Sequence, residues 1–156
     1  MIIRRAMPAD TAAILHLIRA LATYEREPDA VRTDEAALHD TLFAADARVS
    51  AHVAESEGEI VGIAVWFLNY STWTGRPGIY LEDLFVTEVA RGTGAGKALF
   101  RALAQEAVAN GYTRIDWAVL DWNQPAKDFY QAIGGRRQTT WEPWRIDGAA
   151  LQELAR

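Results

Sequence analysis

The sequence predicts one α/β domain with hairpins in its first half and strand–helix units in its second half. The chain has 156 residues, within the usual size of a single domain. Half of the residues are hydrophobic, which is enough for one packed core. Apolar runs and helical apolar stripes alternate in the order β-α-α-β-β-β-α-β-α-β. We therefore expect a single domain over residues 1–156.

The first half is predicted to hold two helices followed by a hairpin. Asp10 is expected to cap the first helix by accepting N–H groups of its opening turn, and Thr33 is expected to cap the second. Strands are expected over 49–55 and 60–70, with a turn at Glu57 and Gly58. The apolar stripes of the two helices are Ile14, Leu15, Ile18, Leu21 and Ala22, then Leu38, Leu42 and Phe43.

The second half is predicted to alternate strands and helices. A strand over 79–87 leads into a helix over 94–110, which ends at Gly111. A strand over 113–120 leads into a short helix that Asn123 opens. A strand over 136–146 and a short C-terminal helix are expected to follow. The stripe of the long helix is Leu99, Phe100, Leu103, Ala107 and Val108.

Composition excludes several classes of protein. The chain has no cysteine, so disulfides, thiol nucleophiles and Cys-ligated zinc are excluded, and its three scattered His predict no metal site. No apolar run is long enough to span a bilayer, and the N-terminus does not resemble a signal peptide. The net charge is −5 and the cations are spread along the chain. We expect a cytoplasmic protein that binds neither membrane nor nucleic acid.

A glycine-rich turn between the predicted strand and the long helix indicates an anion site. Glycines let a ligand approach the backbone, and a helix N-terminus offers unpaired N–H groups. Arg91 and Ala98 break the Walker A pattern, and Lys97 or Leu99 stands where the dinucleotide pattern needs its third glycine. A tight strand–helix turn without a ligand is the alternative.

A second group of residues lies on the next predicted helix. Tyr130 follows Asn123 by seven residues, nearly two helical turns, so both face one side. An ordinary core tyrosine beside Phe129 is the alternative for Tyr130.

These motifs resemble a known family. The pattern Arg-x-x-Gly-x-Gly at 91–96 resembles the pyrophosphate-binding motif of the GCN5-related N-acetyltransferase (GNAT) superfamily, and the pattern from Asn123 through Tyr130 resembles its later motif. The strings at 21–25 and 80–86 resemble the diamine (spermidine/spermine N1-) acetyltransferase-like branch, and the likeness runs from about residue 2 to 147. The resemblance implies a central mixed sheet flanked by helices, acetyl-coenzyme A between the fourth and fifth strands, and a homodimer.

The resemblance also implies site residues, each taken at its matching position. Tyr130 matches the catalytic tyrosine, and Glu82 matches the proposed base. Residues implied to hold the cofactor are Leu84, Phe85, Val86, Arg91, Gly92, Thr93, Gly94, Ala95, Gly96, Lys97, Asn123, Gln124, Pro125 and Ala126. Residues expected to touch the amine acceptor are Tyr24, Glu25, Glu82, Asp83 and Trp122.

Elementary chemistry agrees with these roles. An alkylammonium with a pKa of about 10.4 must lose a proton before it attacks a thioester, so it needs a carboxylate. Adjacent strand residues point to opposite faces, so only one of Glu82 and Asp83 is expected to face the cleft, and we favour Glu82. A solvated strand carboxylate is the alternative for Glu82. The Tyr130 hydroxyl can protonate the leaving thiolate, and a strand N–H near Val86 can stabilise the oxyanion.

The six tryptophans allow two interpretations. Core and interface packing explains most of them, whereas Trp73 or Trp122 could wall a cationic amine through cation–π contact.

The sequence therefore predicts an acetyl-coenzyme A-dependent N-acetyltransferase that acts on a small primary amine, namely a polyamine, a diamine or a lysine-like amino acid. Direct attack on the thioester is expected, because the chain has no cysteine to carry an acyl group. The alternatives are a protein or peptide N-acetyltransferase and a non-catalytic acyl-coenzyme A-binding module.

Overall fold

A computed structural model describes residues 1–156 and divides the chain into two compact units. The first, Met1–Leu120, contains a five-stranded sheet and three α-helices, and the second, Asp121–Arg156, contains two short helices. No helix combines the length and the apolar character needed to cross a bilayer.

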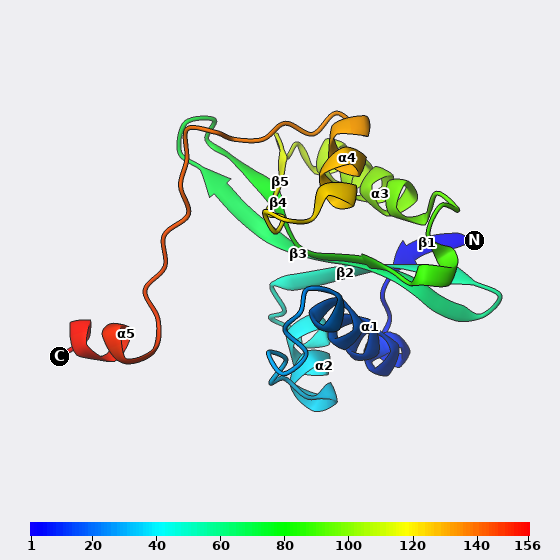
Figure 1. The fold of residues 1–156 in the computed structure, drawn as a ribbon, viewed down its shortest axis with the longest axis horizontal. Helices are drawn as coiled ribbons and strands as arrows, with labels where there is room; N and C mark the ends of the chain where they lie inside the picture. Colours follow the sequence, from blue (N-terminus) through cyan, green and yellow to red (C-terminus); the bar gives the residue numbers. More distant parts are fainter. The chain divides into compact units, whose positions relative to one another are not determined.

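The sheet of the first unit is mixed, as expected (Figure 1). Its strands follow chain order, and the first four are antiparallel, whereas the fourth and fifth are parallel. The strands are β1 (Ile2–Arg5), β2 (Val49–Ser56), β3 (Glu59–Ser71), β4 (Arg76–Val86) and β5 (Ile115–Trp117). The turn between β2 and β3 has positive φ at Glu57 (53°) and Gly58 (84°), the backbone of a two-residue hairpin turn, so that turn prediction is confirmed.

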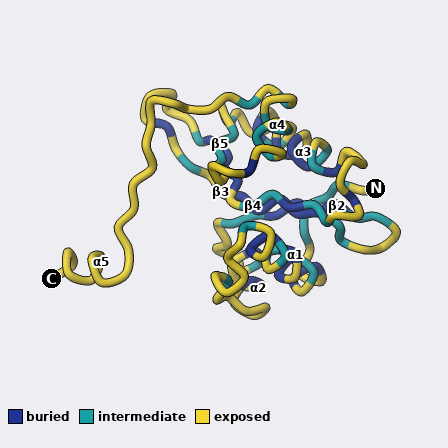
Figure 2. The backbone as a smooth tube through the Cα atoms, in the orientation of Figure 1, coloured by how far each residue is buried: buried dark blue, intermediate teal, exposed yellow.

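Helices cover both faces of the sheet. Helices α1 (Thr11–Tyr24) and α2 (Glu35–Phe43) lie on one face, and α3 (Ala95–Asn110) lies on the other (Figure 1). The predicted stripes of α1 and α2 are buried or pack against the core (Figure 2). In α3 the stripe is buried except at Val108, which is 81% exposed, because one residue beyond Ala107 turns the side chain about 100° towards solvent. Two short 3-10 turns are η1 (Pro8–Asp10) and η2 (Glu88–Ala90).

Asp10 is the N-cap of α1 as predicted but makes no side-chain capping hydrogen bond, and the predicted cap of α2 is wrong. The Asp10 carboxylate accepts hydrogen bonds from Arg4 and from the Met7 N–H instead of from the opening turn of α1. Asp34 caps α2, because its carboxylate accepts the Ala37 N–H at 2.8 Å. Thr33 precedes the cap and only its hydroxyl contacts the Asp34 carbonyl.

Strand β4 has different surroundings along its two halves. Strand β3 pairs with it as far as Val86, but β5 pairs only with Ile79–Leu81. The strand predicted over 113–120 is present only at Ile115–Trp117. The chain leaves β4 after Trp117, so the later residues have no strand to pair with. The half of β4 beyond Leu81 has a strand on one side only.

The second unit contains α4 (Gln124–Ala132) and α5 (Gly148–Leu154), both expected. The strand predicted over 136–146 is absent. A strand needs a partner to satisfy its backbone groups, no ladder reaches this segment, and Pro143 has no N–H to donate. Trp141 and Trp144 in this segment are 68% and 90% exposed, so they are not core residues.

Candidate functional site

Three carboxylates gather where α1 ends near the open half of β4. Glu25 is the C-terminal cap of α1, and Glu82 and Asp83 are neighbours in β4. Burial, with the charges of Glu82 and Glu25, raises the pKa of Asp83 from 3.8 to about 6. Burial also raises the pKa of Glu25. None of the three side chains makes a hydrogen bond or an ion pair, so the cluster is negative and uncompensated.

A β-bulge presents two of these carboxylates. Asp83 lies opposite Val65 of β3, but Leu81 lies opposite the next residue, Trp66, so Glu82 has no partner. We expected only one of the two carboxylates to face the cleft, because neighbouring side chains of a regular strand point to opposite faces. The bulge interrupts that alternation. Glu82 is exposed, and Asp83 is half-buried on the face of Val65, which α1 covers.

The open half of β4 offers backbone groups to a ligand. The Thr87 N–H donates to the Val61 carbonyl at 2.9 Å, which fixes the alternation along the antiparallel pair. The backbone groups of Phe85 therefore point towards β3. Those of Leu84 and Val86 point to the side that β5 leaves free. Of the three residues expected to hold a pantetheine arm, Leu84 has both backbone groups available and Val86 has its N–H, because the Val86 carbonyl accepts a hydrogen bond from Arg91.

The glycine-rich turn forms a cradle at the start of α3. Gly92 and Gly94 have φ of 77° and 90°, a left-handed backbone that favours glycine, and a Cβ at either position would meet no atom within 4 Å. No side chain caps α3, and the N–H groups of residues 94–97 donate no hydrogen bond within the protein. Four unpaired donors at the positive end of a helix fit a pyrophosphate. Lys97 is exposed and makes no ion pair, so its ammonium is available to the same anion.

The Arg91 side chain contacts both β4 and α1. Its Nε donates to the Val86 carbonyl at 3.2 Å, and its guanidinium carbon lies 4.9 Å from the Tyr24 ring centre and 5.7 Å from that of Phe85. The side chain folds back over the end of β4 and contacts the acceptor-side Tyr24. Arg91 thus links the expected acceptor wall with the strand expected to hold the cofactor.

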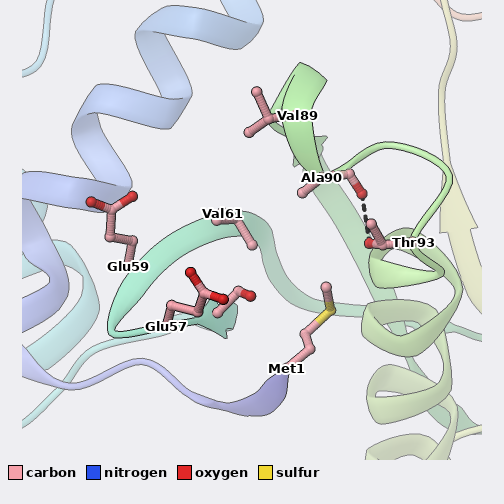
Figure 3. A pocket seen from close by; sticks show the side chains of 8 residues that line it. Met1, Glu57, Glu59, Val61, Val89, Ala90 and Thr93 are labelled. Atoms are coloured by element: carbon pink, nitrogen blue, oxygen red, sulfur yellow. Dashed lines mark hydrogen bonds between the residues drawn. The ribbon is translucent and has the colours of Figure 1, made fainter.

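Thr93 points into a neighbouring hollow, drawn in Figure 3. Its hydroxyl donates to the Ala90 carbonyl at 2.6 Å and so stabilises the turn. Glu57 and Glu59 line the same hollow, whereas the three carboxylates described above do not. This acidic hollow does not suit a phosphate.

The second unit carries the remaining predicted residues. Asn123 caps α4 by accepting the Ala126 N–H at 3.2 Å, and Pro125 lies in the first turn. The Gln124 amide donates to Asp128 one turn later at 2.7 Å, so this side chain is engaged within its own helix. Tyr130 lies on α4 with its ring 5.5 Å from that of Phe129.

The tryptophans divide between packing and exposure. Trp66 is buried, and Trp117 packs edge-on against Phe100 at 5.1 Å. Trp73, at the β3–β4 turn, and Trp122 are 88% and 37% exposed. Both remain candidates for cation–π contact with an acceptor.

The sequence predicts that Glu82, rather than Asp83, faces the cleft as the base. It is Asp83 whose pKa is displaced, because its face of the sheet is covered and two carboxylates lie near it. The alternation of side chains along β4 could have shown that Asp83 lies on the covered face. The one-residue bulge at Glu82 shifts that alternation, and the sequence does not show the bulge.

Comparisons with known proteins point to one family. Residues 12–134 match a family described as Acetyltransferase (GNAT) family. The chain is 40% identical to thialysine N-epsilon-acetyltransferase of Bos taurus, over 98% of this chain and 96% of that protein. It is 38% identical to L-ornithine N5-acetyltransferase of Arabidopsis thaliana, over 61% of this chain and 42% of that protein. An integron cassette protein from the mobile metagenome of V. cholerae superposes with a TM-score of 0.83 at 26% identity, covering 99% of this chain and 96% of that one.

Proposed function

This chain belongs to the acetyltransferase (GNAT) family and is an N-acetyltransferase, and on that premise we propose that it acetylates a small primary amine by direct attack on acetyl-coenzyme A. The observation that carries the choice of acceptor is the uncompensated cluster of Glu25, Glu82 and Asp83 beside the open half of β4. Half-buried carboxylates without a counter-charge are costly, and an ammonium group supplies the missing charge. Relatives named for thialysine and L-ornithine support a small amine.

The residues fit the co-substrate. The N–H groups of residues 94–97 would hold the pyrophosphate, and the outward backbone groups of Leu84 with the Val86 N–H would hold the pantetheine arm. Asn123 and the turn over 124–126 would line its other side, as the resemblance implies. Bound there, acetyl-coenzyme A supplies an activated acyl group. Arg91 contacts both the end of β4 and Tyr24, and so holds them in place beside this site.

The proton of the acceptor goes to the carboxylate cluster. An amine attacks the thioester only after its ammonium form has lost a proton. A base with a pKa near 6 is deprotonated at neutral pH, yet basic enough to share the proton of an attacking amine. The displaced pKa of Asp83 favours it as this base, with Glu82, the sequence prediction, beside it to attract the ammonium. A C–N bond forms and the C–S bond breaks, and coenzyme A leaves as a thiolate.

Tyr130 is proposed to protonate that thiolate, on the resemblance of its motif. Replacing Tyr130 with Phe keeps the ring and removes the donor. We expect kcat to fall about 10²–10⁴-fold with coenzyme A affinity unchanged. A variant within threefold of the wild-type kcat would make Tyr130 a packing residue.

Assembly and location belong to the same proposal. We propose that the two units together form one N-acetyltransferase domain over 1–156, supported by the family match, which crosses the boundary between them. A homodimer follows the resemblance, and light scattering tests it. A cytoplasmic location is supported by the absence of cysteine and by the acidic composition.

An acceptor panel tests the function. Thiol release from acetyl-coenzyme A is measured with monoamines, diamines, ω-amino acids and a lysine-containing peptide. Turnover with the small amines supports the proposal. Turnover with the peptide alone selects a protein N-acetyltransferase, and coenzyme A binding without any turnover selects a non-catalytic module.

A further inference from the structure

The face of the sheet that carries Asp83 continues into a second polar group. Cross-strand partners share a face, and Tyr80 of β4 lies opposite Phe67 on one side and Asp116 of β5 on the other. The Phe67 and Tyr80 rings pack at 5.2 Å. Tyr80 is therefore the β4 residue that pairs with Asp116, and Asp83 follows it along the strand. Burial, with the charges of Glu82 and Asp116, raises the pKa of Tyr80.

The second group is an ion pair between Arg114 and Asp116, and each side chain has polar atoms without a partner in the protein. Arg114 donates from Nε to Asp116 Oδ2 at 2.7 Å, and the Asn69 amide donates to the same oxygen at 3.1 Å. The other carboxylate oxygen of Asp116 and both Nη groups of Arg114 have no partner in the protein. The side chains of Arg114 and Asp116 are 43% and 37% exposed, so both ends are open to a ligand.

The position of this pair is fixed. A Cβ at Gly78 would lie 2.8 Å from Asn69 Oδ1 and 3.0 Å from the Arg114 Cγ. The side chains of Asn69 and Arg114 therefore occupy the space that a side chain at position 78 would need. Asn69 Oδ1 is buried without a hydrogen bond. The Asn69 amide therefore holds Asp116 from one side while Arg114 holds it from the other.

We propose that Arg114 and Asp116 bind the α-amino acid head of the acceptor, so that the acceptor is an ω-amino α-amino acid. The α-carboxylate would take the free Nη groups of Arg114, and the α-ammonium would take the free oxygen of Asp116. Strand positions 80 and 83 lie about 10 Å apart along β4. An extended ω-amino acid spans that distance when the side chains of Arg114 and Asp116 reach its head and the side chain of Asp83 reaches its other end. Its ω-amine then lies at Asp83. Tyr80 lies between the two ends, with its hydroxyl unpaired.

This inference rests on the proposed function and names its acceptor. A simple diamine offers two ammonium groups and nothing for Arg114. An ω-amino acid satisfies both members of the pair. The names of the relatives, one for thialysine and one for L-ornithine, are consistent with an amino acid head.

Three acceptors separate the contacts. L-ornithine carries both head groups, δ-aminovalerate lacks the α-amine, and putrescine lacks the α-carboxylate. We expect Arg114→Gln to raise KM for L-ornithine and δ-aminovalerate about three- to fivefold, the upper end for exposed charge contacts, with kcat retained. KM for putrescine should stay within twofold. Asp116→Asn should raise KM for L-ornithine and leave δ-aminovalerate within twofold.

Arg101→Gln is the matched control, because Arg101 is an exposed arginine on α3, on the opposite face. Thermal unfolding of each variant checks that the fold is intact. Equal effects of Arg114→Gln on all three acceptors, or none on any, would overturn the inference while leaving the proposed function in place. Wild-type enzyme that turns over no small amine would instead remove the proposed function itself.

Discussion

Two clusters of acidic side chains occupy the same compact unit and differ in their counter-charge. In the first, Arg4 binds Asp10 at 2.7 Å and Glu55 at 2.8 Å, and the Met7 N–H also donates to Asp10. The Arg4 hydrogen bond lowers the pKa of Asp10 although burial acts in the opposite direction.

In the second cluster, Glu25, Glu82 and Asp83 have no cation, and the pKa of Asp83 is raised to about 6. Each cluster contains a carboxylate that is at least half-buried, so the difference lies in whether the protein supplies a positive charge. Where the protein supplies it, the carboxylates hold β1, η1 and β2 together. Where the protein supplies none, we propose that the carboxylates bind a cationic ligand.

The largest expected effect comes from removing the unbalanced charge at the site. Asp83→Asn should lower kcat with any acceptor amine about 10²–10⁴-fold, because the proton acceptor is lost. Coenzyme A affinity, measured by calorimetry, should not change. A variant that keeps its rate within threefold would transfer the base role to Glu82 or to water.

Removing the counter-charge from the first cluster should destabilise the fold. Arg4→Met leaves Asp10 buried and Glu55 half-buried without a cation. We expect a loss of about 3 kcal/mol in the free energy of unfolding, the lower end for a broken buried pair, because the Arg4 side chain is 24% exposed. Urea unfolding followed by tryptophan fluorescence measures it. Arg156→Met, which breaks an exposed pair with Glu153, is the control and should change little.

The same Asp83→Asn variant should be more stable than wild type at neutral pH. A folded-state pKa raised from 3.8 to about 6 favours the protonated carboxyl. Its stabilising contribution is full below about pH 4 and is lost as pH rises through 6. Asparagine has no charge to desolvate, so the gain should be on the order of 1–3 kcal/mol near pH 8. It should shrink as pH falls towards 4. Chemical unfolding at several pH values tests this, and a gain independent of pH would contradict it.

The smallest effect distinguishes the two neighbours in β4. Glu82 raises the pKa of Asp83, so Glu82→Gln should move the acidic limb of the pH–rate profile to lower pH by less than about one unit. If Glu82 itself is the base, that limb should flatten instead. Glu88→Gln, at an exposed carboxylate of η2, is the control.

The sequence was most informative where a local pattern decides the structure. The glycine turn before α3, the hairpin at Glu57 and Gly58, and the stripe of α1 follow from rules that act within a few residues. Asn123 as the cap of α4 is another such case. These features were predicted from spacing and residue type alone.

Features that depend on distant partners were not predictable in this way. The bulge at Glu82 appears only when β3 is aligned against β4. The Asp10 carboxylate makes no capping hydrogen bond, because it binds Arg4 on another element. The segment 136–146 has strand-like residues but no strand to pair with. The pairing of Asp116 with Arg114 and Asn69 likewise needed the register of three strands.

The bulge in β4 has a further consequence for solubility. A strand with one bare side invites another molecule's strand to add to it, which begins aggregation. Here the bare side starts at Glu82, where the bulge interrupts the backbone spacing and two adjacent carboxylates stand together. An incoming strand would meet an irregular edge and repulsion from two like charges. The irregularity that presents the carboxylates thus also protects the edge of the sheet from other copies of the protein.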